Sequence, residues 1–347
     1  MTASPDTAFA WEPAPDRSLE DVVSACVSMS DAATMTTAPD WTIAIPTFRR
    51  PALLVETVKS VLAQTDLADV ELIVVDNDPE SSGAAALLAA VPDLRSIPFR
   101  YFRNSRNVGM FGNWNACFHM ARGTWVTVLN DDDLLAPDFV KTMRGVLRDD
   151  PAIDAMTCSY RFMDCRPGGR GDAPLPWRER IRNIFRFGLR DRRQLKVRQM
   201  FFGSIAGSSL GLVVRRAVAL SIGGFRSAEY PSADYYFSAR LARRYRFVQI
   251  RQALAIVRVA ENESARPETL IGFVQRQGEL QSAMLGKDVP VWWRRFQAPS
   301  LHLALTHLNR FWRASLEEHD VSRTTGLPIA PRGALSTKIA RLLIGAI

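Results

Sequence analysis

Three consecutive carboxylates are the side chains of this sequence best suited to chemistry. The apolar run at residues 126–129 ends in Asn130 and then in Asp131, Asp132 and Asp133. A β-branched run between polar residues predicts a buried strand, and three adjacent anions repel one another unless a cation lies among them. Open α/β sheets bind their ligands at the carboxyl ends of strands. We therefore predict a site for Mg²⁺ or Mn²⁺, which prefer oxygen ligands; a solvated acidic loop is the alternative.

Strands and helices alternate along the region that would position this cluster. We expect strands at residues 41–47, 71–76, 99–102 and 124–130, and helices at 51–64, 84–90 and 110–121. Such alternation predicts an α/β fold with a mainly parallel sheet and helices on both faces. The strand ends at Thr47, Asp76 and Asp131 would then line one crevice.

The rest of the chain divides around this region. Residues 1–40 are rich in Pro, Ala, Ser, Thr and Asp and predict a flexible leader, apart from a possible short helix at 19–29. The alternation loosens after the acidic cluster, up to about residue 264. Residues 265–319 have mostly helical periodicity and residues 334–347 fit a small amphipathic helix, so residues 265–347 are predicted to form a helical C-terminal extension.

Length and composition limit the classes of protein to which this chain can belong. The chain has 347 residues, of which 47% are hydrophobic and 23% charged, so it can bury a large core. It shows no run of about 18 apolar residues and no signal-peptide pattern, which predicts a cytoplasmic protein. Four scattered cysteines lack zinc-ligand or redox spacing, and we expect reduced, mostly buried thiols: Cys26, Cys117, Cys158 and Cys165.

Positive charge is concentrated in one stretch of the chain. The formal net charge is +8, which predicts anionic partners. Residues 177–198 hold nine Lys or Arg against two acids, with apolar residues three to five positions apart. This spacing predicts an amphipathic basic helix, and with it a peripheral membrane contact at the inner membrane face or a contact with acceptor phosphates. A solvated helix face packed on its own domain is the alternative.

Several short motifs follow one another in a fixed order. They are residues 43–50 (IAIPTFRR), 72–77 (LIVVDN), 107–109 with Asn115, 130–135 (NDDDLL), and 223–225 (GGF) with Asp234. In this order and spacing, over roughly two-thirds of the chain, they resemble the family 2 glycosyltransferases of GT-A fold, which are inverting enzymes of the D-x-D type. The resemblance implies a Rossmann-like nucleotide-diphospho-sugar transferase domain at 41–264, with a nucleotide-binding half at 41–135 and an acceptor half at 136–264.

The same resemblance implies which residues contact the nucleotide sugar. Asp76 would accept the ring N–H of a uracil-like base, although capping of the following turn is the alternative. Asp131 would orient the ribose and Asp133 would hold the metal that bridges the phosphates, while Asp132 fits either role. Arg258 lies in a late segment that resembles a loop closing over the diphosphate. The full implied set is Pro46, Thr47, Arg49, Asp76, Asn107, Asn115, Asp131, Asp132 and Arg258.

Asp234 is the candidate catalytic base. The acceptor hydroxyl must lose its proton as it attacks the anomeric carbon, which calls for a carboxylate opposite the leaving diphosphate. Asp234 follows the GGF motif at the position that resembles the family's base, but Ala233 stands where many relatives carry a second acid. The alternative is that Asp234 only stabilises the start of a helix, as an acid in the first turn does.

These features and the family resemblance together predict a metal-dependent glycosyltransferase, and the resemblance implies that it inverts the anomeric configuration. It would move a sugar from a nucleoside diphosphate donor, with UDP- or dTDP-sugars expected, to a saccharide or lipid-linked acceptor in polysaccharide or glycolipid biosynthesis. A sugar-nucleotide pyrophosphorylase is one alternative, but residues 46–51 are not the Gly-rich basic loop that such an enzyme needs. A catalytically inactive scaffold or nucleic-acid-binding protein is the other. No stacking platform of aromatic and basic residues accompanies the arginines, so no nucleic acid is expected.

Overall fold

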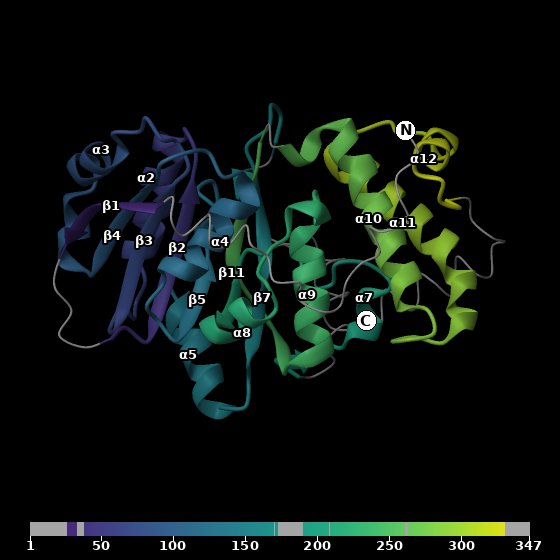
Figure 1. Cartoon of the computed structure of the whole chain (residues 1–347), viewed down its shortest axis with the longest axis horizontal. Coiled ribbons are helices and arrows are strands. Elements are labelled where there is room, and N and C mark those ends of the chain that lie inside the picture. The colour runs from purple at the N-terminus through teal and green to yellow at the C-terminus, as the bar shows by residue number, and fades with distance from the viewer. Residues whose placement is uncertain are drawn as a thin grey trace.

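The computed structural model describes residues 26–32, 38–169, 171–172, 190–207, 209–260 and 263–329. Within these residues one mixed sheet runs in the order β1-β4-β3-β2-β5-β10-β7-β11-β6, with β8 added to β7 and β9 added to β11. Figure 1 labels strands β1, β2, β3, β4, β5, β7 and β11 of this sheet. The strands are β1 Cys26–Ala32, β2 Trp41–Thr47, β3 Val70–Asp76, β4 Phe99–Asn104, β5 Trp125–Val128, β6 Leu134–Leu135, β7 Ala155–Asp164, β8 Gly171–Asp172, β9 Arg192–Gln194, β10 Leu212–Arg215 and β11 Phe247–Val259.

Helices connect and cover these strands. The α-helices are α2 Pro51–Leu62, α3 Gly83–Ala90, α4 Met110–Met120, α5 Phe139–Asp149, α7 Val197–Met200, α8 Arg216–Ser221, α9 Ala233–Arg244, α10 Pro267–Met284, α11 Arg294–Trp312 and α12 Glu318–Thr325. Four 3₁₀ turns are described: η1 Pro92–Ser96, η2 Ser227–Glu229, η3 Glu263–Ala265 and η4 Val291–Trp293. The alternation predicted over residues 41–130 is therefore confirmed.

The four strands β4, β3, β2 and β5 lie parallel to one another, so their carboxyl ends share one edge of the sheet. Every residue of β2 and of β3 is buried, as expected for parallel strands covered on both faces. Successive side chains of these strands enter two different cores. Ala44 and Ile73 pack in the cluster that contains α4, whereas Ile43 and Leu72 pack in the cluster that contains α2, α3 and α5.

The second half of the sheet is mixed. β10 runs antiparallel to β5 and to β7, and β11 runs parallel to β7 and antiparallel to β6. Because β10 is antiparallel to β5, β10 begins at the edge where β5 ends. This topology brings the segment before β10 to the same edge as the acidic triplet.

A layer of helices lies beside α9 at the C-terminal end of the described chain (Figure 1). α10 and α11 bury a small core of their own with α12, made by Val274, Leu301, Leu305, Val321 and Ile329. The helical extension predicted from the sequence is confirmed for the residues that the structure describes. In that part of the chain no helix combines the length and the apolar character that a membrane span requires.

Two expectations from the sequence need correction. Residues 26–32 form strand β1, which pairs antiparallel with β4, so part of the expected flexible leader belongs to the sheet and the helix expected at 19–29 is wrong for residues 26–29. The basic stretch 177–198 is not one helix: Arg192–Gln194 pairs with β11, and α7 begins at Val197. Backbone pairing with a neighbouring strand outweighed the local helical spacing. Residues 1–25, 33–37 and 173–189 lie outside the described residues.

Candidate active site

Two of the predicted strand ends meet directly. The Thr47 hydroxyl, at the end of β2, donates a hydrogen bond of 2.7 Å to Oδ2 of Asp131, which follows β5. The backbone N–H of Phe48 lies 3.4 Å from the same oxygen. β2 and β5 pair in parallel register, and their adjacent ends therefore place these two segments together. The structure thus brings the predicted strand ends Thr47 and Asp131 into direct contact.

One cation already pairs with two of the three acids. Nη1 of Arg50 lies 2.9 Å from Oδ2 of Asp132 and 3.4 Å from Oδ1 of Asp131. Arg50 immediately precedes α2, whose first residue is Pro51, a favoured residue at the first helical position. The guanidinium offsets part of the repulsion within the triplet. Arg50 is not among the site residues expected from the sequence.

Asp133 is buried and held by two donors. Its Oδ2 accepts a hydrogen bond of 3.0 Å from the Asn130 side chain, and its Oδ1 accepts one of 2.9 Å from the backbone N–H of Arg258. Burial, with the neighbouring Asp132 charge, raises the pKa of Asp133 to about 7. Burial likewise raises the pKa of Asp131 to about 6, against the lowering effect of its bond from Thr47. Both carboxyls therefore sit where additional positive charge would stabilise the ionised form.

The guanidinium of Arg258 reaches over the backbone of the triplet. Its Nε donates a hydrogen bond of 3.0 Å to the carbonyl oxygen of Asp132, and its Nη2 forms an ion pair with Glu56 on α2. Arg258 reaches this position because β11 runs antiparallel to β6, which directly follows the triplet. The sequence predicted Arg258 as a site residue, but it gave no signal for Glu56, a contact 202 positions away in the chain.

Asp76 lies at the base of a cleft at the same edge. Its Oδ2 accepts a hydrogen bond of 2.6 Å from the Tyr101 hydroxyl, and its Oδ1 accepts one of 3.0 Å from the backbone N–H of Asp78. Burial, with this bond to Asp76, raises the pKa of Tyr101. Tyr101 comes from β4, next to β3, and its position within that strand gave no sign of its role in the sequence.

The cleft that contains Asp76 has a volume of about 520 Å³ and is bounded by α2 and α3. Arg49 lies at its rim in the left-handed backbone region, with φ of 56°, and pairs with Asp78 at 2.8 Å. Pro46 does not line the cleft; it is buried within β2, paired with Val75 of β3. The polar side chains that line the cleft are those of Thr47, Arg49, Arg50, Asp76, Asp78, Ser81, Ser82 and Tyr101.

Two asparagines predicted as site residues, Asn107 and Asn115, form hydrogen bonds within the protein and do not line the cleft. Asn107 accepts hydrogen bonds from the Asn77 side chain at 2.9 Å and from the Gly109 backbone at 2.8 Å, which shapes the turn before α4. The buried Asn115 amide accepts from the Phe225 N–H at 2.8 Å and donates to the Phe225 carbonyl at 2.7 Å. These bonds account for both side chains without a ligand, and donor contact by either residue stays a prediction.

Asp234 lies in the first turn of α9. Its Oδ1 accepts a hydrogen bond of 2.8 Å from the backbone N–H of Tyr235, and its carboxylate also accepts one from the backbone of Ser209. Burial raises the pKa of Asp234 to about 6. Ser209 lies just before β10, which begins where β5 ends, so Asp234 lies at the same edge of the sheet as the acidic triplet.

The turn before α9 is held by buried polar groups. Gly223 and Gly224 both have positive φ, 77° and 58°. A Cβ at Gly224 would lie 2.2 Å from Oδ1 of Asn115. Arg240 donates a hydrogen bond of 2.9 Å to the Gly224 carbonyl and pairs with the buried Glu229. The glycines of the GGF motif are thus required by close approach of Asn115 and by backbone conformation.

The residues of the triplet could hold a divalent cation together with substrate oxygens. Among the described residues, no group of three or more His, Cys, Asp or Glu side chains is arranged to hold a metal ion by itself. Mg²⁺ is usually bound by only one or two carboxylates together with substrate phosphates and water. Asp131 and Asp133 are buried carboxyls with raised pKa, so positive charge supplied with a substrate suits them.

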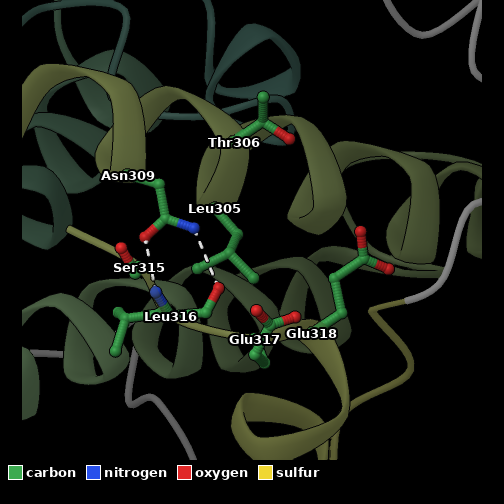
Figure 2. A pocket seen from close by; sticks show the side chains of 7 residues that line it. All are labelled: Leu305, Thr306, Asn309, Ser315, Leu316, Glu317 and Glu318. Atoms are coloured by element: carbon green, nitrogen blue, oxygen red, sulfur yellow. Dashed lines mark hydrogen bonds between the residues drawn. The ribbon is translucent and has the colours of Figure 1, made fainter. Parts of the chain in front are cut away.

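A second cavity lies among the C-terminal helices and has a volume of about 250 Å³. Figure 2 shows the Asn309 side chain of α11 bonded to both backbone polar groups of Leu316. Nδ2 of Asn309 donates to the Leu316 carbonyl oxygen at 2.9 Å, and Oδ1 accepts from the Leu316 N–H at 3.1 Å. Glu317 and Glu318 stand at its border. Its polar groups serve the loop before α12, and none of the predicted site residues lines it.

Comparison with known sequences identifies the family that the central region of the chain matches. Residues 42–210 match the sequence model of Glycosyl transferase family 2. Succinoglycan biosynthesis protein ExoO of Rhizobium meliloti is 37% identical over 105 residues, which cover 30% of this chain and 29% of that protein. A GalNAc(5)-diNAcBac-PP-undecaprenol beta-1,3-glucosyltransferase of Campylobacter jejuni is 33% identical over 106 residues, which cover 30% of this chain and 33% of that protein. The chain thus spans a third or less of the length of these two relatives.

Solved structures share the fold over most of the chain. S. aureus TarS 1–349 in complex with UDP-GlcNAc superposes with a TM-score of 0.58 at 14% identity, covering 88% of each chain. Mannosyltransferase PcManGT from Pyrobaculum calidifontis, in complex with GDP-Man and Mn²⁺, gives a TM-score of 0.54 at 18% identity, covering 91% of this chain and 88% of that one. At these identities the similarity establishes the fold: a GT-A-type α/β sheet with helices on both faces and a helical C-terminal region.

Proposed function

The chain belongs to glycosyl transferase family 2 through residues 42–210, and from this premise we propose that it is a metal-dependent, inverting glycosyltransferase. It transfers a sugar from a nucleoside diphosphate sugar, with UDP or dTDP as the expected nucleotide, to an acceptor hydroxyl. The observation that carries the proposal is the bond between Thr47 and Asp131 at the strand ends, beside the cleft that contains Asp76. Open α/β sheets bind their ligands at this edge.

The nucleotide is assigned to the cleft between α2 and α3. Asp76 lies at its base, and each of its oxygens already accepts one hydrogen bond. A carboxylate oxygen has a second lone pair, so Asp76 retains capacity to accept the ring N–H of a uracil or thymine base. Arg49 places a guanidinium at the same cleft. The ribose contact is assigned to Asp131, which accepts a hydrogen bond from the cleft residue Thr47.

The transfer is assigned to a single displacement with Asp234 as the base. The acceptor oxygen bonds to the anomeric carbon as the bond from that carbon to the diphosphate oxygen breaks, which inverts the configuration. Asp234 takes the proton from the acceptor hydroxyl. A pKa of about 6 keeps Asp234 ionised at neutral pH and makes it more basic than an ordinary Asp.

Residues Asp131 to Asp133 fit a divalent metal brought in with the donor phosphates. When bound, Mg²⁺ or Mn²⁺ supplies positive charge to the departing diphosphate. Asp133 is assigned as the protein ligand, and Asn130 and the Arg258 backbone hold its carboxylate in place. Arg258, fixed by the Asp132 carbonyl and Glu56, supplies a further cation at this edge.

A saccharide or lipid-linked acceptor is the second substrate we propose, in polysaccharide or glycolipid assembly. The names of the two relatives support this class, since one is a succinoglycan biosynthesis protein and the other acts on an undecaprenol-linked saccharide. A cytoplasmic location at the inner membrane face belongs to the same proposal. So does an acceptor or membrane contact through residues 177–198.

The test is a thermal-shift panel of nucleoside diphosphates and their sugars, with and without Mn²⁺. A ligand at a hundred times its Kd stabilises the fold by about 2.7 kcal/mol. We expect UDP or dTDP with Mn²⁺ to raise Tm, and the same nucleotide without metal to raise it less. Absence of any shift with every nucleotide tried would contradict the assignment of the cleft.

A further inference from the structure

An exposed apolar tip projects between α10 and α11. We call residues 290–295, which include η4, the tryptophan tip. Val291 and Trp292 are 57% and 55% exposed, the two largest values among the exposed large hydrophobic residues of the described chain. The two residues are also consecutive. The tip therefore presents an apolar patch at one point of the surface rather than isolated apolar side chains.

The tip is built to hold this patch outward. Trp293 turns inward and packs against Phe201 and Phe202, with ring centroids 5.4 and 5.3 Å away. The Trp293 N–H donates a hydrogen bond of 2.9 Å to the Pro290 carbonyl, and the preceding turn is closed by a bond of 2.8 Å from Gly286 to Val289. Exposure of Trp292 is thus fixed by the anchoring of its neighbour, which makes the apolar surface preformed.

Cations flank the apolar residues. Arg294 and Arg295 are exposed, and the Arg295 guanidinium lies 4.5 Å above the Trp292 ring. Within the described part of the chain neither arginine forms an ion pair. Lys287 is also exposed, whereas Asp288, the acid nearest in sequence, is bonded to Arg243 at 2.9 Å with its side chain 6% exposed. Residues 287–295 therefore carry a net positive charge, with their one acid already paired.

We propose that the tryptophan tip docks the protein on an anionic membrane surface. Val291 and Trp292 enter the interfacial layer, where tryptophan is favoured because one end of its ring is apolar and the other polar. Arg294, Arg295 and Lys287 lie against the lipid phosphates. The proposal rests on the tip alone and does not depend on glycosyl transfer.

Charge complementarity selects this partner over a second copy of the chain. A symmetric dimer through the tip would place Arg294 and Arg295 of both copies in one interface, because a twofold interface uses the same surface on both sides. Like charges in such a contact repel. An anionic bilayer offers both the opposite charge and an apolar layer for Val291.

The test is sedimentation of the full chain with vesicles at low salt. One set contains phosphatidylcholine and phosphatidylglycerol in equal parts, and the other phosphatidylcholine alone. We expect binding to the anionic vesicles only. Arg294→Gln with Arg295→Gln should weaken it about 25-fold, since each cation near an anionic surface contributes about fivefold. Val291→Ser with Trp292→Ser should weaken it about tenfold or more through lost apolar contact.

Arg310→Gln with Arg323→Gln is the matched control, because it removes the same charge from exposed positions of the same helical layer. The control should bind anionic vesicles as the wild type does. Equal losses in the control and in the tip variant would show a general charge effect and would overturn the proposal. So would unchanged binding in both tip variants, which would place the contact elsewhere, for instance in residues 177–198.

A fluorescence experiment locates the contact on Trp292 itself. Vesicles with brominated phosphatidylglycerol should quench part of the emission of the eight tryptophans. Trp292→Phe should still sediment with the vesicles but should lose most of the quenching. Quenching that is equal in wild type and variant would contradict insertion of Trp292. If the nucleotide raises the Tm of every tip variant as much as it raises that of the wild type, donor binding is separate from membrane docking.

Discussion

At the scale of single residues, Asp234 has the two properties that a general base requires. Its carboxylate is fixed by backbone N–H groups of Tyr235 and Ser209, and burial raises its pKa to about 6. A side chain that only capped the helix would be expected to gain stability as an anion. Here burial opposes the anion while the backbone hydrogen bonds favour it, so the catalytic and capping roles are distinguished by substitution, and the catalytic role stays a prediction.

Asp234→Asn should reduce transfer by about 10²- to 10⁴-fold, the usual contribution of general acid–base catalysis. Asn keeps the size and accepts hydrogen bonds but cannot take a proton. The wild-type rate should fall as pH drops below about 6, because protonated Asp234 cannot act as a base. Initial rates of transfer over a pH series, with donor binding measured separately by thermal shift, check both statements.

The stability of the Asp234→Asn variant distinguishes a catalytic role of Asp234 from a capping role. The folded-state pKa of Asp234 lies above its unfolded value, so its ionisation lowers stability as pH rises from the ordinary Asp value to about 6, and the full loss is present at neutral pH. Asp234→Asn removes that ionisation, and its Tm at neutral pH should equal or exceed that of the wild type. A lower Tm combined with an unchanged rate would support the capping role and would contradict our assignment.

Asp133→Ala should abolish the Mn²⁺ dependence of donor turnover while the fold persists. Removal of one carboxylate relieves repulsion by Asp132, so the loss of two hydrogen bonds is partly offset. Donor hydrolysis against Mn²⁺ concentration, with circular dichroism as the check on folding, measures this. Asp138→Ala, which removes a carboxylate outside the cleft, is the control, and near-normal Mn²⁺ response in Asp133→Ala would show that the metal role belongs to another acid.

At the scale of elements, the site depends on how α9 is placed. Asn115 of α4 forms hydrogen bonds with both the backbone N–H and the carbonyl of Phe225. Arg240 of α9 donates a hydrogen bond to the Gly224 carbonyl. The buried Glu229 compensates the charge of Arg240. Together these contacts tie α4 to the turn that starts α9, and they set where the carboxylate of Asp234 lies relative to the sheet edge.

Gly224→Ala should therefore displace Asp234 and reduce activity, although Gly224 itself is not a proposed site residue. The new Cβ meets Oδ1 of Asn115 at 2.2 Å and occupies a backbone conformation with φ of 58°, which costs a non-glycine residue about 1–2 kcal/mol before any clash. We expect a lower Tm and a reduced kcat with donor affinity little changed. Urea unfolding and steady-state kinetics measure these effects.

The variant Gly224→Ala with Asn115→Ala distinguishes the clash from the backbone strain. Removal of the Asn115 amide relieves the contact but not the positive φ. The double variant should therefore lose less stability than the sum of the two single variants. Additive losses would show that Asn115 does not limit the space at Gly224.

At the scale of the whole molecule, the sequence predicts those parts of the fold that depend on local pattern. Thr47 and Asp131 could be placed together because parallel strands share an edge, and the structure joins them by a hydrogen bond. Tyr101 and Glu56 could not be found, since their contacts with Asp76 and Arg258 depend on how distant segments pack. The helix expected at 177–198 is wrong for residues 192–194 because strand pairing is also a long-range interaction.

The packing of the C-terminal helices bears on the domain boundary expected at residue 264. Leu280 and Met284 of α10 and Phe296 of α11 belong to the same continuous hydrophobic cluster as Ala44 of β2 and Phe237 of α9. Gln281 of α10 also donates a hydrogen bond of 2.6 Å to the Phe201 carbonyl. A core shared in this way predicts that the helical layer and the sheet unfold together.

The full chain should accordingly unfold in a single transition. Urea unfolding followed by circular dichroism, which reports helices and strands, and by tryptophan fluorescence should give coincident curves with one midpoint. Trp293 and Trp312 report on the helical layer, and Trp41 and Trp125 on the sheet. Phe296→Ala, placed where the layers meet, should lower the midpoint of both curves equally, by about 3–5 kcal/mol in free energy of unfolding for a buried Phe. Two separated midpoints would instead mean that residues 265–347 fold as an independent unit.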